Sequence, residues 1–222
     1  MAGQINRGDF FGDQIFNLSS VKQFENFVEV GTWNGQGSTK CFMDAILYRN
    51  DTSKLYTVEA NIKFYEEAKS YWQPLLSLNR IPYEKIEMLY GRIIEADQLI
   101  TIDEIKNHKI FNKHPWLEWR ERNVSEYQMC ENVTKKLPET IDVLLLDGGQ
   151  FSTLAEWETL KNRTKVILLD DTTTFKTEKI RNELIENNDW KVIFDNLNYR
   201  NGIFIACRKE YFDLVKNCIG IQ

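Results

Sequence analysis

The residues that most constrain how this chain can fold are 27–39, which read FVEVGTWNGQGST. An apolar run there leads into a turn containing Gly31, Gly35 and Gly37, and Ser38 or the residue after it begins a predicted helix. In α/β proteins, a strand followed by a glycine-rich turn and a helix N-terminus makes room for a nucleotide-like ligand. Glycines allow a close approach because they have no Cβ atom. The sequence therefore predicts an α/β fold with a ligand site at this turn.

The spacing within this turn argues against the two commonest phosphate-binding motifs. Starting at Gly35 the sequence reads Gly-x-Gly-x-x-Lys, so the third glycine of the dinucleotide-binding motif is missing. A P-loop is absent as well, because no Gly-Lys-Ser/Thr follows the required spacer. Glu29 lies two residues before Gly31, and an acid at that position suits a ligand with a cationic amino-acid end. This combination favours S-adenosylmethionine over a dinucleotide.

The composition is that of one enzyme-sized domain spanning residues 1–222. A hydrophobic content of 42% with 13% aromatic residues supports a sizeable core. The net charge of -5 argues against a broad electrostatic grip on nucleic acid, so no nucleic-acid partner is expected. The N-terminus lacks a basic-then-apolar signal segment, and no apolar run is long enough to span a membrane. We therefore expect a cytoplasmic protein.

The four cysteines are dispersed along the chain, without the paired spacing of a zinc site or the density of a disulfide framework. Two of them lie in apolar strand or helix patterns, where cysteine is usually a buried free thiol. We therefore expect free thiols at Cys41, Cys130, Cys207 and Cys218.

Short apolar runs alternate with helical patterns along the chain, which is typical of a mostly parallel sheet with helices on both faces. Two runs, at residues 143–146 and 166–169, are apolar on both alternating faces and indicate central buried strands. The last two runs indicate an antiparallel pair that closes the sheet edge. Seven strands are expected, at residues 27–32, 55–60, 86–92, 141–148, 165–171, 191–196 and 203–208.

Helix signals lie between these runs and before them. Residues 1–26 form a predicted N-terminal helical segment. Asn61 is expected to cap a helix that extends to about residue 77 and is interrupted by Pro74. Thr153 and Glu156 have the spacing of a capping box, before a helix that ends near residue 161.

Residues 108–140 do not fit the alternation and form a predicted insertion. They are dense in aromatic and charged residues, including the run HPWLEWRER at 114–122. One interpretation is a surface helix with a buried tryptophan stripe. The other is an insertion over the mouth of the site, where aromatic faces and arginines would bind a polyhydroxylated or anionic acceptor. The sequence does not separate the two.

Acidic residues stand at the ends of several predicted strands. Glu59 ends the second strand, where a carboxylate can bind both hydroxyls of an adenosine ribose, although an acid at a strand end is often simply solvated. Gly91 and Arg92 end the third strand, where an adenine would lie. In register with the glycine turn, Glu59 is predicted to bind the ribose.

Three more carboxylates, Asp147, Asp170 and Asp171, follow the fourth and fifth strands at the same edge of the sheet. Clustered acids repel one another unless a cation shares the site. Mg²⁺ takes oxygen ligands of this kind and could lower the pKa of an acceptor hydroxyl. Alternatively, Asp147 orients the ligand's amino group while Asp170 caps a turn. Lys176 would stabilise a developing alkoxide or be a solvated lysine.

These motifs together resemble those of class I S-adenosylmethionine-dependent methyltransferases, in the order and spacing found there and over nearly the whole chain. The chain is most similar to the small methyltransferases found in polysaccharide-biosynthesis gene sets of bacteria and large DNA viruses. The segments that carry the resemblance are residues 29–39, 58–59, 146–149 and 169–171.

The resemblance implies a Rossmann-like, doubly wound, mostly parallel sheet and S-adenosyl-L-methionine as cofactor. Asp147 would lie beside the transferred methyl group. The residues implied in cofactor binding are Glu29, Gly31, Thr32, Trp33, Gly35, Gly37, Ser38, Glu59, Ala60, Gly91, Arg92 and Asp147. The residues implied in catalysis are Asp147, Asp171 and Lys176, and those implied in binding Mg²⁺ or another divalent cation are Asp147, Asp170 and Asp171.

The chain departs from the pattern of related metal-dependent sugar O-methyltransferases at one position. Those enzymes often have an acidic residue or histidine just after the first metal ligand, as general base. Here Gly149 and Gln150 stand there, and neither side chain accepts a proton in ordinary catalysis. His108 and His114 are the only histidines of the chain. The general base is therefore not identified by the sequence.

The function expected from the sequence is an S-adenosylmethionine-dependent O-methyltransferase acting on a sugar hydroxyl of a glycan or nucleotide sugar. No amine-methylating Asn/Asp-Pro-Pro-Tyr/Phe motif follows the fourth strand, which favours a hydroxyl acceptor. The alternatives are another small-molecule acceptor and a catalytically silent binding module. A nicotinamide oxidoreductase is disfavoured by the incomplete glycine motif. Homo-oligomers and a fusion to glycosyltransferase domains stay open.

Overall fold

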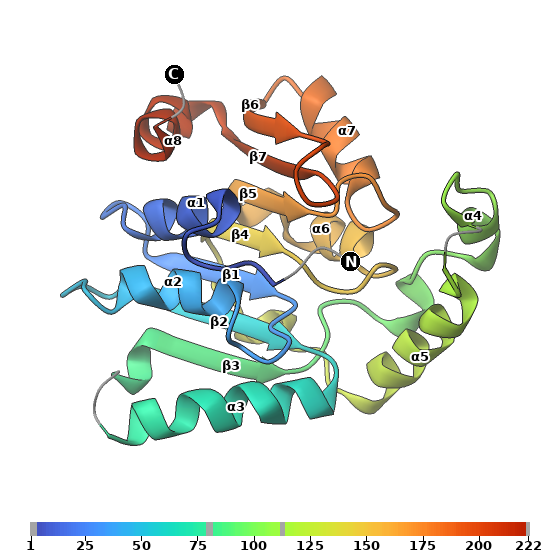
Figure 1. Ribbon diagram of the computed structural model, residues 1–222, viewed down its shortest axis with the longest axis horizontal. Coiled ribbons are helices and arrows are strands. Elements are labelled where there is room, and N and C mark those ends of the chain that lie inside the picture. Colours follow the sequence, from blue (N-terminus) through green and yellow to red (C-terminus); the bar gives the residue numbers. More distant parts are fainter. Residues whose placement is uncertain (1–3, 79–81, 112–113, 221–222) are drawn as a thin grey trace.

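The computed structural model describes residues 4–78, 82–111 and 114–220. Residues 1–3 of the predicted N-terminal segment and 112–113 of the predicted insertion lie outside this described part. A seven-stranded sheet runs through the molecule in the order β3-β2-β1-β4-β5-β7-β6 (Figure 1). Its strands are β1 (Asn26–Val30), β2 (Lys54–Glu59), β3 (Ile86–Tyr90), β4 (Ile141–Leu146), β5 (Thr164–Asp170), β6 (Trp190–Asn196) and β7 (Ile203–Arg208).

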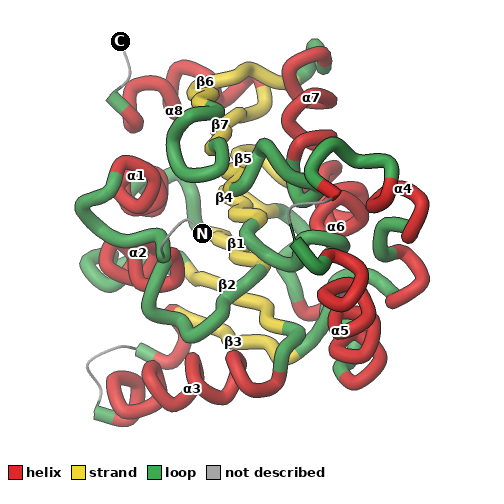
Figure 2. The backbone as a smooth tube through the Cα atoms, turned by 45° about the vertical axis from the view of Figure 1, so that its right-hand side comes forward, coloured by secondary structure: helices red, strands yellow, loops and turns green. Residues whose placement is uncertain are grey.

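Helices cover both faces of this sheet in two layers (Figure 2). One layer holds α1 (Phe10–Ser19), α2 (Ser38–Ile46), α3 (Ile62–Ser77) and α8 (Phe212–Ile219). The other holds α4 (Ile102–Lys106), α5 (Trp116–Met129), α6 (Thr153–Leu160) and α7 (Glu178–Glu186). Short 3₁₀ turns connect them at η1 (Tyr83–Lys85), η2 (Ala96–Gln98), η4 (Thr134–Lys136), η5 (Lys161–Arg163) and η6 (Lys209–Tyr211).

The first five strands pair in parallel, whereas β7 pairs antiparallel with both β5 and β6. This confirms the predicted doubly wound sheet with its antiparallel edge pair. Strand β4 is buried at every position, as its continuous apolar run predicted. Val143 and Leu145 pack with α1 and α2, while Leu144 and Leu146 pack with the opposite layer, because successive side chains of a strand point to opposite faces.

The direction of winding reverses at β1, which lies between β2 and β4. Ligands of open α/β sheets bind at such a switch point, beyond the carboxyl ends of the strands. Gly31 follows β1 directly with φ +99°, and a Cβ atom there would lie 2.4 Å from the Asp147 carbonyl oxygen. A larger residue would push the ends of β1 and β4 apart. The positive φ also ends β1 at Val30, two residues before the predicted end.

Helix α3 begins as predicted but is not interrupted. Asn61 Oδ1 accepts hydrogen bonds from the backbone N–H groups of Lys63 (3.0 Å) and Phe64 (3.2 Å), which confirms the N-cap. The predicted interruption at Pro74 is wrong, because the helix continues through it to Ser77. Proline removes only one backbone hydrogen bond, and here the loss falls near the end of a helix that is already formed.

The predicted capping box at the start of α6 is wrong. Ser152 is the N-cap residue and makes no capping side-chain bond, while Thr153 is already helical and donates its hydroxyl to the Gly149 carbonyl (2.8 Å). Glu156 does not reach back to the backbone, because its carboxylate accepts a hydrogen bond from the Tyr127 hydroxyl (2.6 Å). The hydrogen bond between Tyr127 and Glu156 therefore replaces the contact with the backbone that a capping box requires of Glu156.

The cysteines are free thiols, as the sequence predicted: three are buried and Cys218 is half-buried. Among the described residues, no helix has both the length and the apolar character needed to cross a membrane.

Candidate functional site

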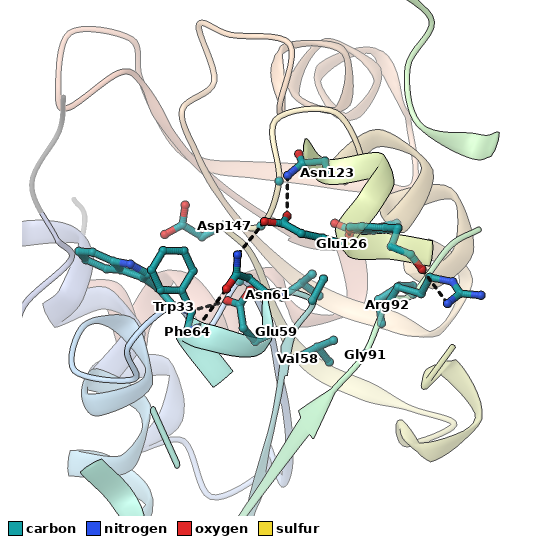
Figure 3. A pocket seen from close by; sticks show the side chains of 18 of the residues that line it. Trp33, Val58, Glu59, Asn61, Phe64, Gly91, Arg92, Asn123, Glu126 and Asp147 are labelled. Carbon is teal, nitrogen blue, oxygen red and sulfur yellow. Dashed lines mark hydrogen bonds between the residues drawn. The ribbon is translucent and has the colours of Figure 1, made fainter. Parts of the chain in front are cut away.

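A pocket of about 300 Å³ opens at the carboxyl edge of the sheet, at the β1–β4 switch point. Strand ends form its floor, and α5 forms one wall (Figure 3). Trp33 and Phe64 lie near one end and Arg92 near the other. The lining residues are Val30, Gly31, Trp33, Val58, Glu59, Ala60, Asn61, Phe64, Gly91, Arg92, Ile93, Arg122, Asn123, Glu126, Tyr127, Asp147, Gly148, Gly149 and Glu156.

Glu29 lies beneath the glycine turn and is fully buried, with 0% exposure. Its carboxylate accepts hydrogen bonds from the hydroxyls of Ser38, Thr39 (2.6 Å) and Thr57 (3.0 Å). These contacts tie β1 to the first turn of α2 and to β2. Glu29 does not line the pocket, so its predicted contact with the methionine end of a ligand stays a prediction.

Burial raises the pKa of Glu29 to about 7, against an ordinary 4.5, although its three hydroxyl partners oppose the shift. A raised pKa in the folded state stabilises the protein below pH 4.5, and that contribution is lost as the pH rises toward 7. Relative to Glu29→Gln, the wild-type free energy of unfolding is expected to fall by up to about 3 kcal/mol across this window. Urea denaturation of both proteins at several pH values measures the difference, and parallel pH curves would contradict it.

Glu59 ends β2 and lines the pocket. Its Oε2 accepts a hydrogen bond from the Trp33 backbone N–H (2.8 Å), and its Oε1 accepts one from Asn61 (2.9 Å). A carboxylate oxygen has two lone pairs, so each oxygen keeps one for a further donor. The backbone bonds also fix the orientation of the carboxylate. Burial raises the pKa of Glu59 to about 7, although the two backbone bonds oppose the shift. In its ionised form the carboxylate can accept two hydrogen bonds from a vicinal diol in the pocket.

The three aspartates at the ends of β4 and β5 come together, with one oxygen from each within 4.8 Å of the others. They are already paired with cations. Lys176, 3% exposed, contacts Asp147 and Asp171, the latter at 3.1 Å. Arg200 donates two hydrogen bonds to Asp170, of 2.8 and 3.1 Å. The sequence left open that Lys176 is simply a solvated lysine, and its burial rules this out.

Burial and charge act against each other in this cluster. Burial raises the pKa of Asp147 to about 6, although Lys176 opposes the shift. Burial also works against ionisation of Asp171, yet Lys176 holds the pKa of that carboxyl below its usual range. The pKa of Lys176 itself is raised, because the surrounding carboxylates outweigh the cost of its burial. Lys176 therefore stays charged throughout the range in which proteins work.

Helix α5 supplies the part of the pocket that the sequence did not identify. The Asn61 side-chain amide donates to Glu126 Oε1 (2.6 Å), and that of Asn123 donates to Glu126 Oε2 (2.9 Å). Tyr127 bonds Glu156 on α6. Asn123, Glu126 and Tyr127 are three and four residues apart and so share one helix face, which is the only sequence signal that could have found them.

Within residues 108–140, helix α5 contributes both to the core and to the pocket wall, whereas contact of this segment with an acceptor stays a prediction. Trp116 is buried in the core, at 5.0 Å between ring centroids from both Trp119 and Phe175. The next turns of the same helix place Arg122 and Asn123 in the pocket wall. Buried tryptophan packing thus holds α5 against the sheet so that its polar face borders the site.

The predicted site residues divide into two groups. Those that line the pocket are Gly31, Trp33, Glu59, Ala60, Gly91, Arg92 and Asp147. Those that do not are Glu29, Thr32, Gly35, Gly37, Ser38, Asp170, Asp171 and Lys176. Gly35 serves packing, since a Cβ atom there would lie 2.9 Å from Nε1 of Trp72 on α3.

Neither histidine reaches the pocket. His108 is hydrogen-bonded to Glu178 on α7 (2.8 Å), and His114 stacks on Trp119. Both therefore serve contacts around α4 and α5. The titratable residues that border the pocket are Glu59, Glu126, Asp147, Glu156, Tyr127 and two arginines.

No protein-family model matches this sequence. No curated protein matches it either. Solved structures do match, and they define the class of fold as that of S-adenosylmethionine-dependent methyltransferases, a Rossmann-like fold with this strand order.

Three of the matching solved structures illustrate this similarity, and two of them are described as O-methyltransferases. The O-methyltransferase from Bacillus cereus, in complex with S-adenosylhomocysteine, is 15% identical, with 89% of this chain and 80% of that chain covered and a TM-score of 0.56. TomG from Streptomyces achromogenes, an O-methyltransferase in complex with S-adenosylmethionine, is 15% identical, with 89% and 78% covered and a TM-score of 0.55. The methyltransferase PaMTH1 from Podospora anserina, bound to S-adenosylhomocysteine, is 11% identical, with 89% and 77% covered and a TM-score of 0.57. Identities this low show the fold.

Proposed function

We propose that this protein is an S-adenosylmethionine-dependent O-methyltransferase. The observation that carries the proposal is Glu59, whose oriented carboxylate faces the switch-point pocket with one free lone pair on each oxygen. We propose that this carboxylate binds the ribose of the cofactor, which is the role expected from the sequence. The fold is that of methyltransferases solved with S-adenosylmethionine or its demethylated product.

The cofactor, when bound, supplies a methyl group that is already activated for displacement. The protein must align the acceptor and help its hydroxyl to lose a proton. Asp147 suits the second task, because Lys176 holds its Oδ1. Its Oδ2 accepts no hydrogen bond from the described residues. We assign Asp147 as the group that accepts the hydroxyl proton, and we propose it as the general base that the sequence left unidentified.

This assignment gives a pH dependence. The proton can be accepted only by the ionised carboxylate, and burial raises the pKa of Asp147 to about 6. The rate constant kcat/KM is therefore expected to rise with pH up to about 6 and to level off above it. Initial rates between pH 5 and 8 measure this profile. A rate that stays constant down to pH 5 would rule out Asp147 as the base.

The acceptor we propose is a sugar hydroxyl of a glycan or nucleotide sugar. The pocket wall supports this choice, because Asn61, Asn123 and Glu126 present amide and carboxylate groups that hydrogen-bond hydroxyls. A panel of nucleotide sugars, free sugars and catechol-type phenols, assayed for S-adenosylhomocysteine release, tests it. Turnover with phenols alone would redirect the acceptor to another small molecule. No turnover with cofactor bound would favour a binding module.

A divalent cation on Asp147, Asp170 and Asp171 was also predicted. The three carboxylates lie close enough together for a metal site. However, Lys176 lies in contact with two of them and Arg200 is paired with the third. The donor set fits a metal only if Lys176 leaves, so no step of the reaction is assigned to one. The cytoplasmic location, the lack of a nucleic-acid partner, and any homo-oligomer or glycosyltransferase fusion stay predictions.

Calorimetric titration with S-adenosylmethionine and with S-adenosylhomocysteine tests the cofactor directly. Binding of either in the micromolar range supports the proposal, and absence of binding by folded protein contradicts it. The titration is repeated with Mg²⁺ and with EDTA. Equal affinities in the two conditions are expected if the cofactor site does not include a metal.

A further inference from the structure

The Lys176 ammonium takes the position that a metal ion would need. It contacts Asp147 Oδ1 and lies 3.1 Å from Asp171 Oδ2, so it bridges the ends of β4 and β5. A Mg²⁺ ion would have to bind these same oxygens at about 2.0–2.1 Å. Nζ and the ion cannot both occupy that space. A metal could enter only if Lys176 moved out.

The chain around Lys176 opposes such a movement. Phe175 is buried against Trp116, with ring centroids 5.0 Å apart. Thr177 is fully buried and donates its hydroxyl to the Asp170 carbonyl (2.8 Å). Thr174 donates its hydroxyl to the Gln150 side chain (2.9 Å). The residues on both sides of Lys176 are therefore anchored, and its ammonium is directed at the two carboxylates.

The charge of the cluster points in the same direction. Three carboxylates face two cations, Lys176 and Arg200, which leaves one net negative charge. The methyl donor of the proposed reaction is a cation, and one negative charge nearby attracts it. A divalent ion that took the place of Lys176 would leave the cluster neutral and would remove this attraction. Without Lys176, the cluster would carry two negative charges, which a divalent ion balances.

We propose that Lys176 is a built-in cation that replaces a divalent metal, so that the protein works without one. Lys176 does not line the pocket and acts through Asp147, which makes it a positioning residue. It holds Asp147 in place and offsets the repulsion between Asp147 and Asp171. The inference that methyl transfer needs no metal rests on the proposed function. The inference that Lys176 keeps a divalent ion out of the cluster does not.

The test is Mn²⁺ binding, followed by the loss of the free-ion electron paramagnetic resonance signal. Wild type is expected to show no Mn²⁺ bound at the cluster up to about 1 mM, and Lys176→Met is expected to bind at least about tenfold more tightly, because a contacting positive charge is gone. Lys179→Met is the matched control, since this exposed lysine on α7 pairs with Glu104 instead. Asp147→Asn should abolish the site gained in Lys176→Met. Mn²⁺ binding that persists in the Asp147→Asn protein lies elsewhere on the surface and is subtracted from the binding assigned to the cluster.

Wild-type protein alone can also overturn the proposal. Mn²⁺ binding by wild type that is lost on Asp147→Asn would show that a metal displaces Lys176. Methyl transfer that stops in EDTA and returns with Mg²⁺ would also overturn the proposal, even if Lys176→Met failed to fold. Failure of the proposed function is a separate result, because it appears as absent cofactor binding and leaves the Mn²⁺ titrations interpretable.

Discussion

Replacing Asp147 with asparagine is expected to lower kcat by about a thousandfold, the middle of the range for loss of a general base. The asparagine keeps the shape of the side chain but cannot take the proton. Its effect on the affinity for S-adenosylhomocysteine, which lacks the sulfonium charge, should be much smaller, because Glu59 and the pocket floor remain. Steady-state kinetics with a saturating acceptor, together with calorimetric titration of S-adenosylhomocysteine, separates turnover from binding.

The matched control for this variant is Asp213→Asn. Asp213 is exposed in the first turn of α8, in the helix layer opposite α5, and its replacement should leave kcat unchanged. Thermal unfolding of both variants shows whether loss of the Lys176 contact weakens the fold. A folded Asp147→Asn protein that retains more than about a tenth of wild-type kcat would contradict the assigned role.

Replacing Glu59 with alanine is expected to weaken S-adenosylmethionine binding by about thirtyfold or more, equivalent to about 2 kcal/mol. The carboxylate is oriented by the backbone N–H groups of Trp33 and Asn61, so its two free lone pairs are ready for the ribose. Glu59→Gln should have an intermediate effect, because the amide retains only one acceptor oxygen. Isothermal titration of the three proteins measures the series.

Glu66→Ala is the control for this series, since Glu66 is an exposed acid on α3. Its affinity for the cofactor should equal that of wild type. Glu59→Ala also leaves two backbone N–H groups without their partner, so its melting temperature must be compared with that of Glu59→Gln. Unchanged affinity in both Glu59 variants would remove the ribose assignment.

The strands were the most predictable part of the fold. A parallel strand covered on both faces must be apolar at successive positions, and residues 143–146 and 166–169 show this directly. The strand ends were less predictable. β1 stops at Val30 because Gly31 turns with φ +99°, two residues before its apolar pattern suggested.

The pocket wall could not be predicted to the same degree. Asn123 and Tyr127 share a face of α5, but a polar helix face can equally point to solvent. The packing of Trp116 against Phe175, 59 residues apart in the sequence, directs that face toward the pocket. Glu156 shows the same limit, since its bond to Tyr127 overrides the capping motif around it.

The sequence by itself determined where the acids of the predicted site gather. Glu59, Asp147 and Asp170 each end or follow a parallel strand, and parallel strands in one sheet end at the same edge. Only the tertiary structure decided which charge meets which. Lys176 lies 29 residues from Asp147, and Arg200 lies 30 from Asp170. Such pairs form when packed loops bring distant segments together, and no local pattern of residues encodes that contact.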